Sequence, residues 1–223
     1  AKEKVTRYFG DIPASATLAD MKTHIPKHAH DTRETIPDRV PQVRLYRGWP
    51  VAEMSTRDAA LLDLFDQVLG GSAASRFDTR LVHGDKIADQ ASAYQWSSEI
   101  SGTFFLVSTV KEGVDPAKVE KALDEELKRL IAEGPTADEL ERAKVAGRAA
   151  FVRGIERIGG FGGKSDVLAS CAVYQGTPDC YKEELDILAN ATAADVQAAA
   201  KKWLAGASHT ILVEPSETPA SAL

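Results

Sequence analysis

Histidines are the first residues to consider for chemistry in this sequence. Two histidines one helical turn apart, with a glutamate beside them, can hold a zinc ion and activate its bound water. That His-x-x-Glu-His pattern occurs nowhere in the 223 residues. The nearest imitation is His24 with His28, but Pro26 lies between them in a stretch without helical periodicity. The other histidines are His30, His83 and His209. We therefore predict no catalytic residue and no metal ligand in this chain.

Residues 160–165, Gly-Phe-Gly-Gly-Lys-Ser, end like a phosphate-binding loop. Such a loop needs another glycine five positions before Gly163, where this chain has Ile158. It also needs a strand in front, whereas residues 148–157 continue a helical pattern. We favour the interpretation that these glycines let two helices bend and pack closely. A second interpretation is a loop that lines a peptide chamber.

Cys171 and Cys180 are the only cysteines. On one continuous helix they could not bond, but residues 176–178, Gly-Thr-Pro, interrupt the chain between them. A disulfide is one option. The interpretation that we favour is two free, half-buried thiols, because free cysteine is commonly buried.

Charged and aromatic residues elsewhere indicate structure more than chemistry. Residues 124–129 form a mixed-charge run that is typical of a solvated helix face with pairs four residues apart. Nothing marks Glu183 and Glu184 as a general acid and base, and no serine or cysteine can be paired with a histidine. The aromatic residues interpreted as core or interface anchors are Trp49, Tyr94, Trp96 and Trp203.

Composition sets broad limits on the protein. A hydrophobic content of 43% in a chain of this length is enough for a substantial core. The net charge of −6, without a basic stripe, argues against nucleic acid as a partner. No apolar run approaches the roughly 20 residues of a membrane-spanning helix. The polar first residues do not resemble a signal peptide, and the chain starts without Met, as an excised fragment would.

Periodicity and turn residues predict the elements that must position any site. We expect residues 1–41 to be the end of a preceding domain plus a linker, because prolines are frequent and periodicity is weak after Gly10. Residues 42–214 would be the folded domain, and residues 215–223 a tail. Strands are predicted at 42–49, 89–96, 103–110 and 209–214. Helices are predicted over 61–68, after a cap at 55–58, and at 75–82, 116–133, 137–157, 164–175, 177–188 and 192–204.

Strands joined by a hairpin, with helices grouped apart from them, favour an α+β fold. The centre of the chain also resembles a known family. Its order is a helix, the pair Gly70-Gly71, Ser75-Arg76 opening a second helix, and a hairpin. This order resembles the non-catalytic repeat of the insulinase/pitrilysin family of zinc metallopeptidases. Residues 7–13 and 160–181 extend the resemblance over nearly the whole chain.

The resemblance implies a fold and a role. The family fold, like that of mitochondrial processing peptidase, is a mostly antiparallel sheet with helices packed on one face. Some family members hold substrate with an arginine and a tyrosine seven residues apart after the Ser-Arg helix. Those positions are occupied here by Val82 and Asp89, which cannot do that job, so the substrate-binding residues are unknown. The departure resembles the second repeat of a catalytic half, whose arginine and tyrosine come from a later repeat or a partner chain.

The resemblance thus leads us to expect a substrate-chamber domain of a zinc-dependent endopeptidase that binds peptides or unfolded segments. Peptide would bind at strand edges and the inner sheet face, next to other domains or a homologous subunit. Zinc belongs to the parent enzyme, and the fragment alone is predicted to be inactive and to need no cofactor. One alternative is a catalytically inactive scaffold subunit of the same family. Another is an unrelated α+β domain that binds a small molecule. The compartment, periplasmic or cytoplasmic, is left open.

Overall fold

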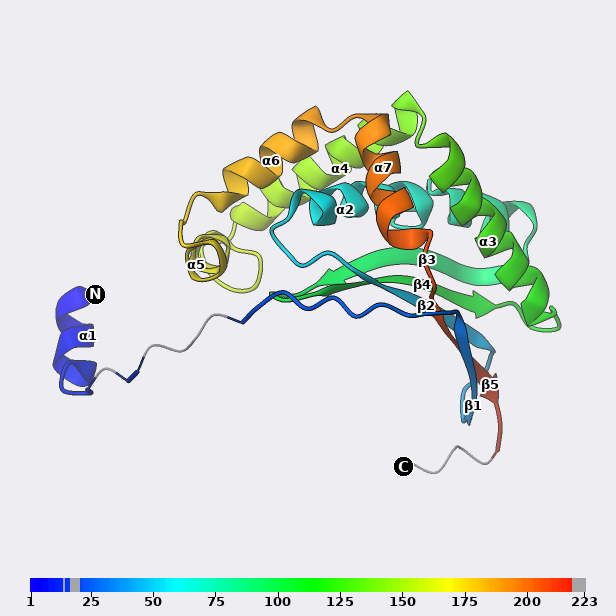
Figure 1. The fold of residues 1–223 in the computed structure, drawn as a ribbon, viewed down its shortest axis with the longest axis horizontal. Helices are drawn as coiled ribbons and strands as arrows, with labels where there is room; N and C mark the ends of the chain where they lie inside the picture. Colours follow the sequence, from blue (N-terminus) through cyan, green and yellow to red (C-terminus); the bar gives the residue numbers. More distant parts are fainter. Residues whose placement is uncertain (14, 17–20, 218–223) are drawn as a thin grey trace.

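One five-stranded sheet, with helices on one of its faces, organises the molecule (Figure 1). The computed structural model describes residues 1–13, 15–16 and 21–217. The strand order is β1-β5-β2-β4-β3. The β1–β5 pair is parallel, and the other pairs are antiparallel. The strands are β1 Thr32–Asp38, β2 Arg44–Val51, β3 Ala88–Ser97, β4 Gly102–Val110 and β5 His209–Pro215.

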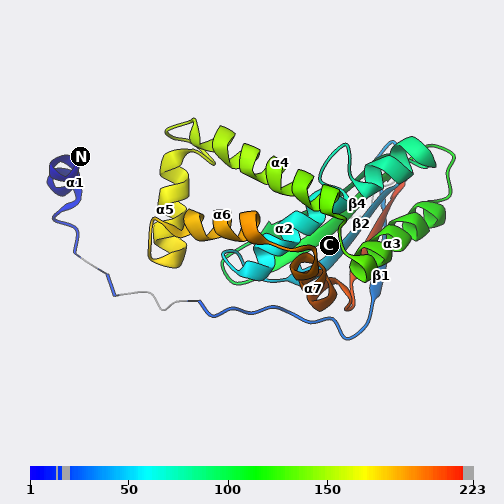
Figure 2. The same ribbon diagram turned by 90° about the horizontal axis from the view of Figure 1, so that it is seen from above.

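The helices form a layer above the sheet, seen from above in Figure 2. Helix α1 is separate from this layer and buries no residue. The element that follows α2 is a π-helix, η1. The helical elements are α1 Lys2–Phe9, α2 Arg57–Leu69, η1 Asp78–Gly84, α3 Pro116–Glu133, α4 Ala137–Ile155, α5 Lys164–Gln175, α6 Cys180–Asn190 and α7 Ala193–Leu204. No described helix is long and apolar enough to cross a membrane.

Local side-chain contacts explain where several helices begin. The Thr136 hydroxyl accepts from the Glu139 backbone N–H, and the Glu139 carboxylate accepts from the Thr136 backbone N–H. Thr192 and Asp195 repeat this reciprocal arrangement at the start of α7. Each pair satisfies two N–H groups that have no partner inside the helix. These caps confirm the helix starts that the sequence predicted.

The core lies between the helix layer and one face of the sheet. Alternate residues of β4, such as Phe104 and Leu106, are fully buried and point toward α2. The Phe104 ring makes edge contacts with Trp49 at 6.4 Å and Phe65 at 6.0 Å between centroids. The α+β prediction, a mostly antiparallel sheet with helices on one face, is therefore confirmed.

Strand β1 was not predicted, because residues 11–41 were expected to be loop-like. Its residues are mostly exposed, so the sequence Thr-Arg-Glu-Thr-Ile-Pro-Asp shows no alternation of apolar and polar side chains. What makes it a strand is its parallel pairing with β5, about 177 residues along the chain, from Thr32 opposite His209 to Asp38 opposite Pro215. The sheet therefore begins at Thr32, within the stretch that was expected to be linker.

The preference for two free cysteines is also wrong. Helix α5 ends at Gly176, whose φ of +69° lets the chain reverse, and α6 begins at Cys180. The reversal brings the Cα atoms of Cys171 and Cys180 to 5.3 Å, and the two residues form a disulfide. The spacing of nine residues therefore spans a turn between two helices.

Candidate functional site

The described histidines do not gather into a metal site. His83 lies 3.1 Å from Asp78 within η1, and His209 Nδ1 lies 2.7 Å from the Thr32 hydroxyl. His24 and His28 lie in an irregular segment without helix, where His24 N–H donates to the Ile100 carbonyl. Among residues 1–13, 15–16 and 21–217, no three histidine, cysteine or acidic side chains are close enough to hold a metal ion.

The glycine-rich residues 160–165 join two helices. Helix α4 runs to Ile155 and α5 begins at Lys164, so no strand precedes the loop. Gly160 and Gly162 adopt positive φ angles of +82° and +72°. The Gly162 N–H donates to the Asp166 carboxylate within the loop. The loop lacks the strand that a phosphate-binding loop requires.

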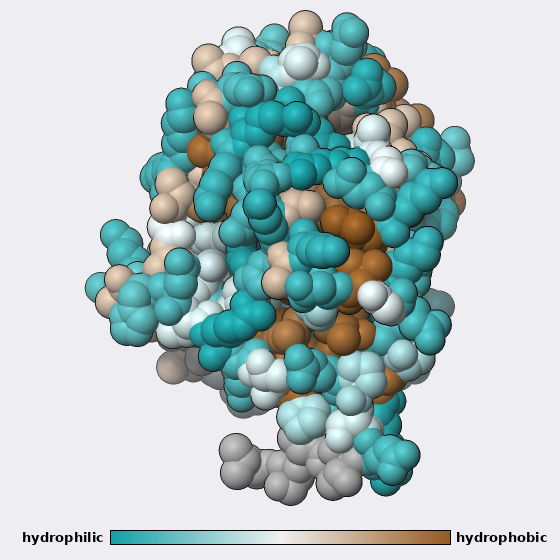
Figure 3. Space-filling model, turned by 90° about the vertical axis from the view of Figure 1, so that its right-hand side faces the viewer, coloured by the Kyte–Doolittle hydropathy of each residue, from teal (hydrophilic) through white to brown (hydrophobic). Residues whose placement is uncertain are grey.

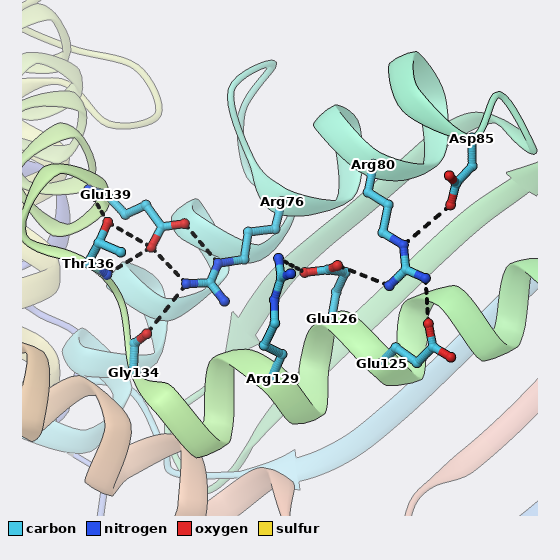
Figure 4. Close-up of polar contacts among 9 residues, drawn as sticks. All are labelled: Arg76, Arg80, Asp85, Glu125, Glu126, Arg129, Gly134, Thr136 and Glu139. Atoms are coloured by element: carbon cyan, nitrogen blue, oxygen red, sulfur yellow. Dashed lines mark hydrogen bonds and ion pairs between the residues drawn. The ribbon is translucent and has the colours of Figure 1, made fainter.

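Val82 and Asp89 stand where the sequence resemblance led us to expect an arginine and a tyrosine for substrate. Val82 is half-buried on η1, and Asp89 is exposed on β3, where it accepts a hydrogen bond from the Gln42 amide. The nearest arginine on η1, Arg80, is occupied by ion pairs with Asp85, Glu125 and Glu126 (Figure 4). It is therefore not free to hold a peptide carbonyl.

Arg76, from the Ser-Arg pair, ties the start of the π-helix segment to the turn between α3 and α4 (Figure 4). Its Nε and one terminal nitrogen donate to the two Glu139 oxygens at 2.8 Å each. The same nitrogen donates to the Gly134 carbonyl at 3.4 Å. The Arg76 hydrogen bonds lower the pKa of Glu139 to about 2. Arg76 is therefore a structural residue that fixes three elements.

Glu126 corrects the expectation of a fully solvated face on residues 124–129. The flanking pairs, Lys121 with Glu125 and Lys128 with Asp124, do lie four residues apart at 3.9 Å. Glu126, however, is only 1% exposed and accepts from Arg80 at 3.0 Å. Arg129 donates to it at 2.6 Å as well. Packing of α3 against η1 buries this one carboxylate and brings Arg80 to it, whereas Arg129 belongs to α3 itself.

The outer edge of β3 is covered by the chain's own α2. The Gln95 backbone N–H, which points away from β4, donates to the Asp66 carboxylate at 3.1 Å. A Cβ atom added at Gly70 would lie 2.2 Å from the Ala93 backbone nitrogen, so Gly70 abuts the strand. Burial, and then the Asp63 charge, raise the pKa of Asp66 well above its ordinary value. Strand addition at β3 would require this contact to open.

The other edge of the sheet is β1. Thr32 N–H donates to the Ser208 carbonyl, and the Asp38 carbonyl accepts from Ser216 N–H. The backbone N–H and C=O groups of the even-numbered residues of β1 therefore point toward β5. The backbone groups of the odd-numbered residues, including Pro37, therefore point away from the sheet. Because proline has no N–H, it interrupts the row of outward donors. Neither edge offers an unbroken template for a peptide strand.

The face of the sheet away from the helices carries exposed aromatic rings. Tyr94 on β3 stacks on Phe105 on β4, with ring centroids 5.3 Å apart. Trp96, two residues along β3 on the same face, is 70% exposed. A hollow of about 230 Å³ lies beside Phe105, with Tyr46 and His28 among its lining residues. Figure 3 shows hydrophobic side chains gathered among hydrophilic ones on the side where β1 and β5 lie.

A second hollow, of about 320 Å³, lies in the helix layer between α2, α4 and α6. It holds two carboxylates, Asp63 and Glu184. Partial desolvation in this hollow, and then the charge of Glu184, raise the pKa of Asp63 above its ordinary value. The Gln95 amide donates to Asp63 at 3.1 Å. Sequence reasoning missed this proximity, because residues 63 and 184 meet only through the packing of α2 against α6.

Comparison with known proteins assigns this sheet and its helix layer to a family. Residues 1–146 match the profile described as the peptidase M16 inactive domain. The chain belongs to this family, which confirms the resemblance to the non-catalytic repeat. No curated protein matches the chain.

Solved structures share the fold. A protease from Helicobacter pylori superposes with a TM-score of 0.81 at 17% identity over 96% of this chain and 51% of its own. The peptidase M16 inactive domain from Pseudomonas fluorescens gives 0.77 at 16% identity, over 98% and 52%. The periplasmic protease PqqL from Escherichia coli gives 0.72 at 16% identity, over 97% and 24%. The chain thus spans about half the length of the first two structures.

Proposed function

We propose that this domain forms part of the wall of the substrate chamber in a zinc-dependent endopeptidase, with the zinc site on another domain. Membership of the inactive-domain family and the lack of a His-x-x-Glu-His sequence support this proposal. Its partners would be other domains of the parent chain, or a homologous subunit, and a peptide or unfolded segment. The zinc of the parent enzyme would supply the activated water.

The observation that carries the proposal is the aromatic surface on the open face of the sheet. Tyr94 and Trp96 are 42% and 70% exposed, in a domain whose own helices pack on the opposite face. Aromatic rings contact apolar side chains of many sequences without a fixed partner. Because Asp66 and Gly70 cover one sheet edge and Pro37 interrupts the other, peptide would be held by side-chain contact with this face.

The test uses the parent enzyme and an unfolded peptide substrate. We expect Trp96→Ala to raise KM several-fold, with kcat and zinc content unchanged, because it removes binding that is equal in ground and transition states. The matched control is Val173→Ser, which removes an apolar side chain that is 73% exposed on α5, in the helix layer. An unchanged KM for Trp96→Ala, or an equal rise in the control, would contradict the chamber assignment.

The second candidate function is a catalytically inactive scaffold subunit of the same family. The observation compatible with it is the loss of the arginine and tyrosine at Val82 and Asp89. The sequence of the parent upstream of Ala1 separates the two candidates. A His-x-x-Glu-His helix there supports the peptidase, and its lack supports the scaffold.

A further inference from the structure

Helix α5 packs more loosely than the rest of the helix layer. It lies at one end of the layer, across the ends of α4 and α6 (Figures 1 and 2). Cys171 is its only buried residue. Three of its apolar side chains are exposed: Leu168 at 43%, Val173 at 73% and Tyr174 at 49%. Burial of its own apolar surface therefore contributes little to holding α5 in place.

The space between α5 and its neighbours is incompletely filled. An apolar hollow of about 220 Å³ lies there, lined by Phe151 and Ile155 of α4, Val167 and Leu168 of α5, and Tyr181 of α6. A hollow of this kind forfeits the dispersion contacts that close packing would supply. The stacked rings of Phe151 and Tyr181, 5.9 Å apart, join α4 to α6 and leave α5 out.

Polar contacts do not replace the missing packing. At the start of α5, Lys164 and Ser165 donate backbone N–H groups to the Arg157 and Ile158 carbonyls of the preceding loop. Beyond that first turn, in the part of the chain that the structure describes, no hydrogen bond or ion pair joins an α5 side chain to α4 or α6. The Cys171–Cys180 disulfide is the one strong connection across the α5–α6 contact.

We propose that this disulfide holds α5 against α6, and that its reduction releases α5 with the glycine-rich loop before it while the sheet domain stays folded. The reductant is an added dithiol, which is itself oxidised to a disulfide in the reaction. The Cys171–Cys180 bond breaks, and each sulfur gains one electron and one proton. The inference is independent of the proposed function.

A buried disulfide that holds an otherwise loose helix suits an oxidising compartment, because cytosolic reductants keep most protein thiols reduced. We therefore assign the folded chain to such a compartment. The first measurement is alkylation of the protein isolated from its native cells under non-reducing, acid-quenched conditions. We expect neither cysteine to be modified. Free thiols at both positions would overturn the assignment.

The second measurement is hydrogen exchange of the full chain, before and after treatment with dithiothreitol, read by mass spectrometry. After reduction, we expect peptides from residues 157–179 to exchange about tenfold faster or more, since local opening no longer breaks a covalent link. Peptides from β2 and β4 should change less than twofold. Alkylation of both cysteines confirms that reduction is complete.

A variant separates the effect of losing the Cys171–Cys180 disulfide from other effects of the reductant. The double substitution Cys171→Ser with Cys180→Ser should show the fast exchange without reductant and no further change with it. Unchanged exchange of residues 157–179 after complete reduction would overturn the proposal. Equal acceleration in the β2 and β4 peptides would also overturn it, because the disulfide would then support the whole domain.

Discussion

Arg76 is a residue whose side chain joins separate elements of the fold. Its side chain is 9% exposed, and its partner Glu139 also caps α4 through Thr136. An arginine fork matches a carboxylate with two parallel hydrogen bonds, which lysine cannot reproduce. The Ser-Arg pair that carried the family resemblance therefore has a structural explanation in this chain.

We predict that Arg76→Ala lowers the free energy of unfolding by about 3 kcal/mol, because it leaves a mostly buried carboxylate without its cation. Arg76→Lys should lose roughly half as much, since charge is kept and the fork is lost. The measurement is urea unfolding at neutral pH. The control is Arg57→Ala, which breaks an exposed pair with Asp195 and should cost about 0.5 kcal/mol or less. An equal loss in both alanine variants would refute the structural role of Arg76.

Asp66 makes the stability depend on pH. Its folded-state pKa is raised above the unfolded value of 3.8, so its contribution is fully present below about pH 4 and is lost as pH rises through the folded pKa. The contribution of Glu139 to stability depends on pH in the opposite direction. Its pKa is lowered from 4.5 to about 2, so its contribution is present above about pH 4.5 and is lost as pH falls toward 2.

We predict that Asp66→Asn reduces the loss of unfolding free energy that accompanies a rise in pH above about 4. The asparagine oxygen can still accept from the Gln95 N–H, and no charge is buried. Urea unfolding at several pH values measures this, with the exposed Glu34→Gln on β1 as the control. If the wild-type protein became more stable as pH rises and the Asp66→Asn variant did not, the predicted direction of the pH dependence would be wrong.

At the scale of elements, the contact of the end of α2 with β3 is what closes one edge of the sheet. Gly70 has an extended φ of −156°, so its requirement for glycine comes from space and not from backbone strain. A Cβ there would meet the Ala93 nitrogen at 2.2 Å and the Ser92 carbonyl carbon at 2.7 Å. Both atoms belong to the β3 backbone, which cannot move as a flexible side chain would.

We predict that Gly70→Ala destabilises the chain by about 2–3 kcal/mol through overpacking, and that β3 backbone amides exchange faster. The matched control is Gly206→Ala, where an added Cβ meets nothing within 4 Å. It should change stability by about 0.5 kcal/mol or less. Thermal or urea unfolding measures the first effect, and hydrogen exchange the second. Equal stability of the two variants would mean that α2 does not press on the strand.

At the scale of the whole molecule, the first 38 residues contain two parts with different roles. Helix α1 buries none of its residues, and its apolar side chains Val5, Tyr8 and Phe9 are 57–67% exposed. An isolated helix of eight residues is marginal in water. Strand β1, in contrast, pairs with β5 along its whole length. The structure thus supports a proposed domain boundary between these two elements.

We predict that deletion of residues 1–12 leaves Tm within about 2 °C of the full chain, since no core contact is lost. Deletion of residues 1–38 should lower Tm by about 5 °C or more and promote association, because it exposes the backbone of β5 as a new edge. Calorimetry and gel filtration measure both. A large loss after the shorter deletion would show that α1 belongs to the domain.

The sequence by itself determined the elements whose stability is local. Thr136 with Glu139, and Thr192 with Asp195, lie three residues apart, so the caps of α4 and α7 form from neighbours in the chain. The missing zinc-binding pattern can likewise be read directly. The order of the glycine pair, the Ser-Arg pair and the hairpin was enough to identify the family.

Only the tertiary structure decided the features that depend on distant residues. Strand β1 has no pattern of its own and exists through pairing with β5. Glu126 resembles its exposed neighbours until η1 packs on α3, and Asp63 meets Glu184 only where α2 meets α6. The disulfide depended on a reversal at Gly176. In each case the free energy comes from contacts between segments whose approach no local propensity specifies.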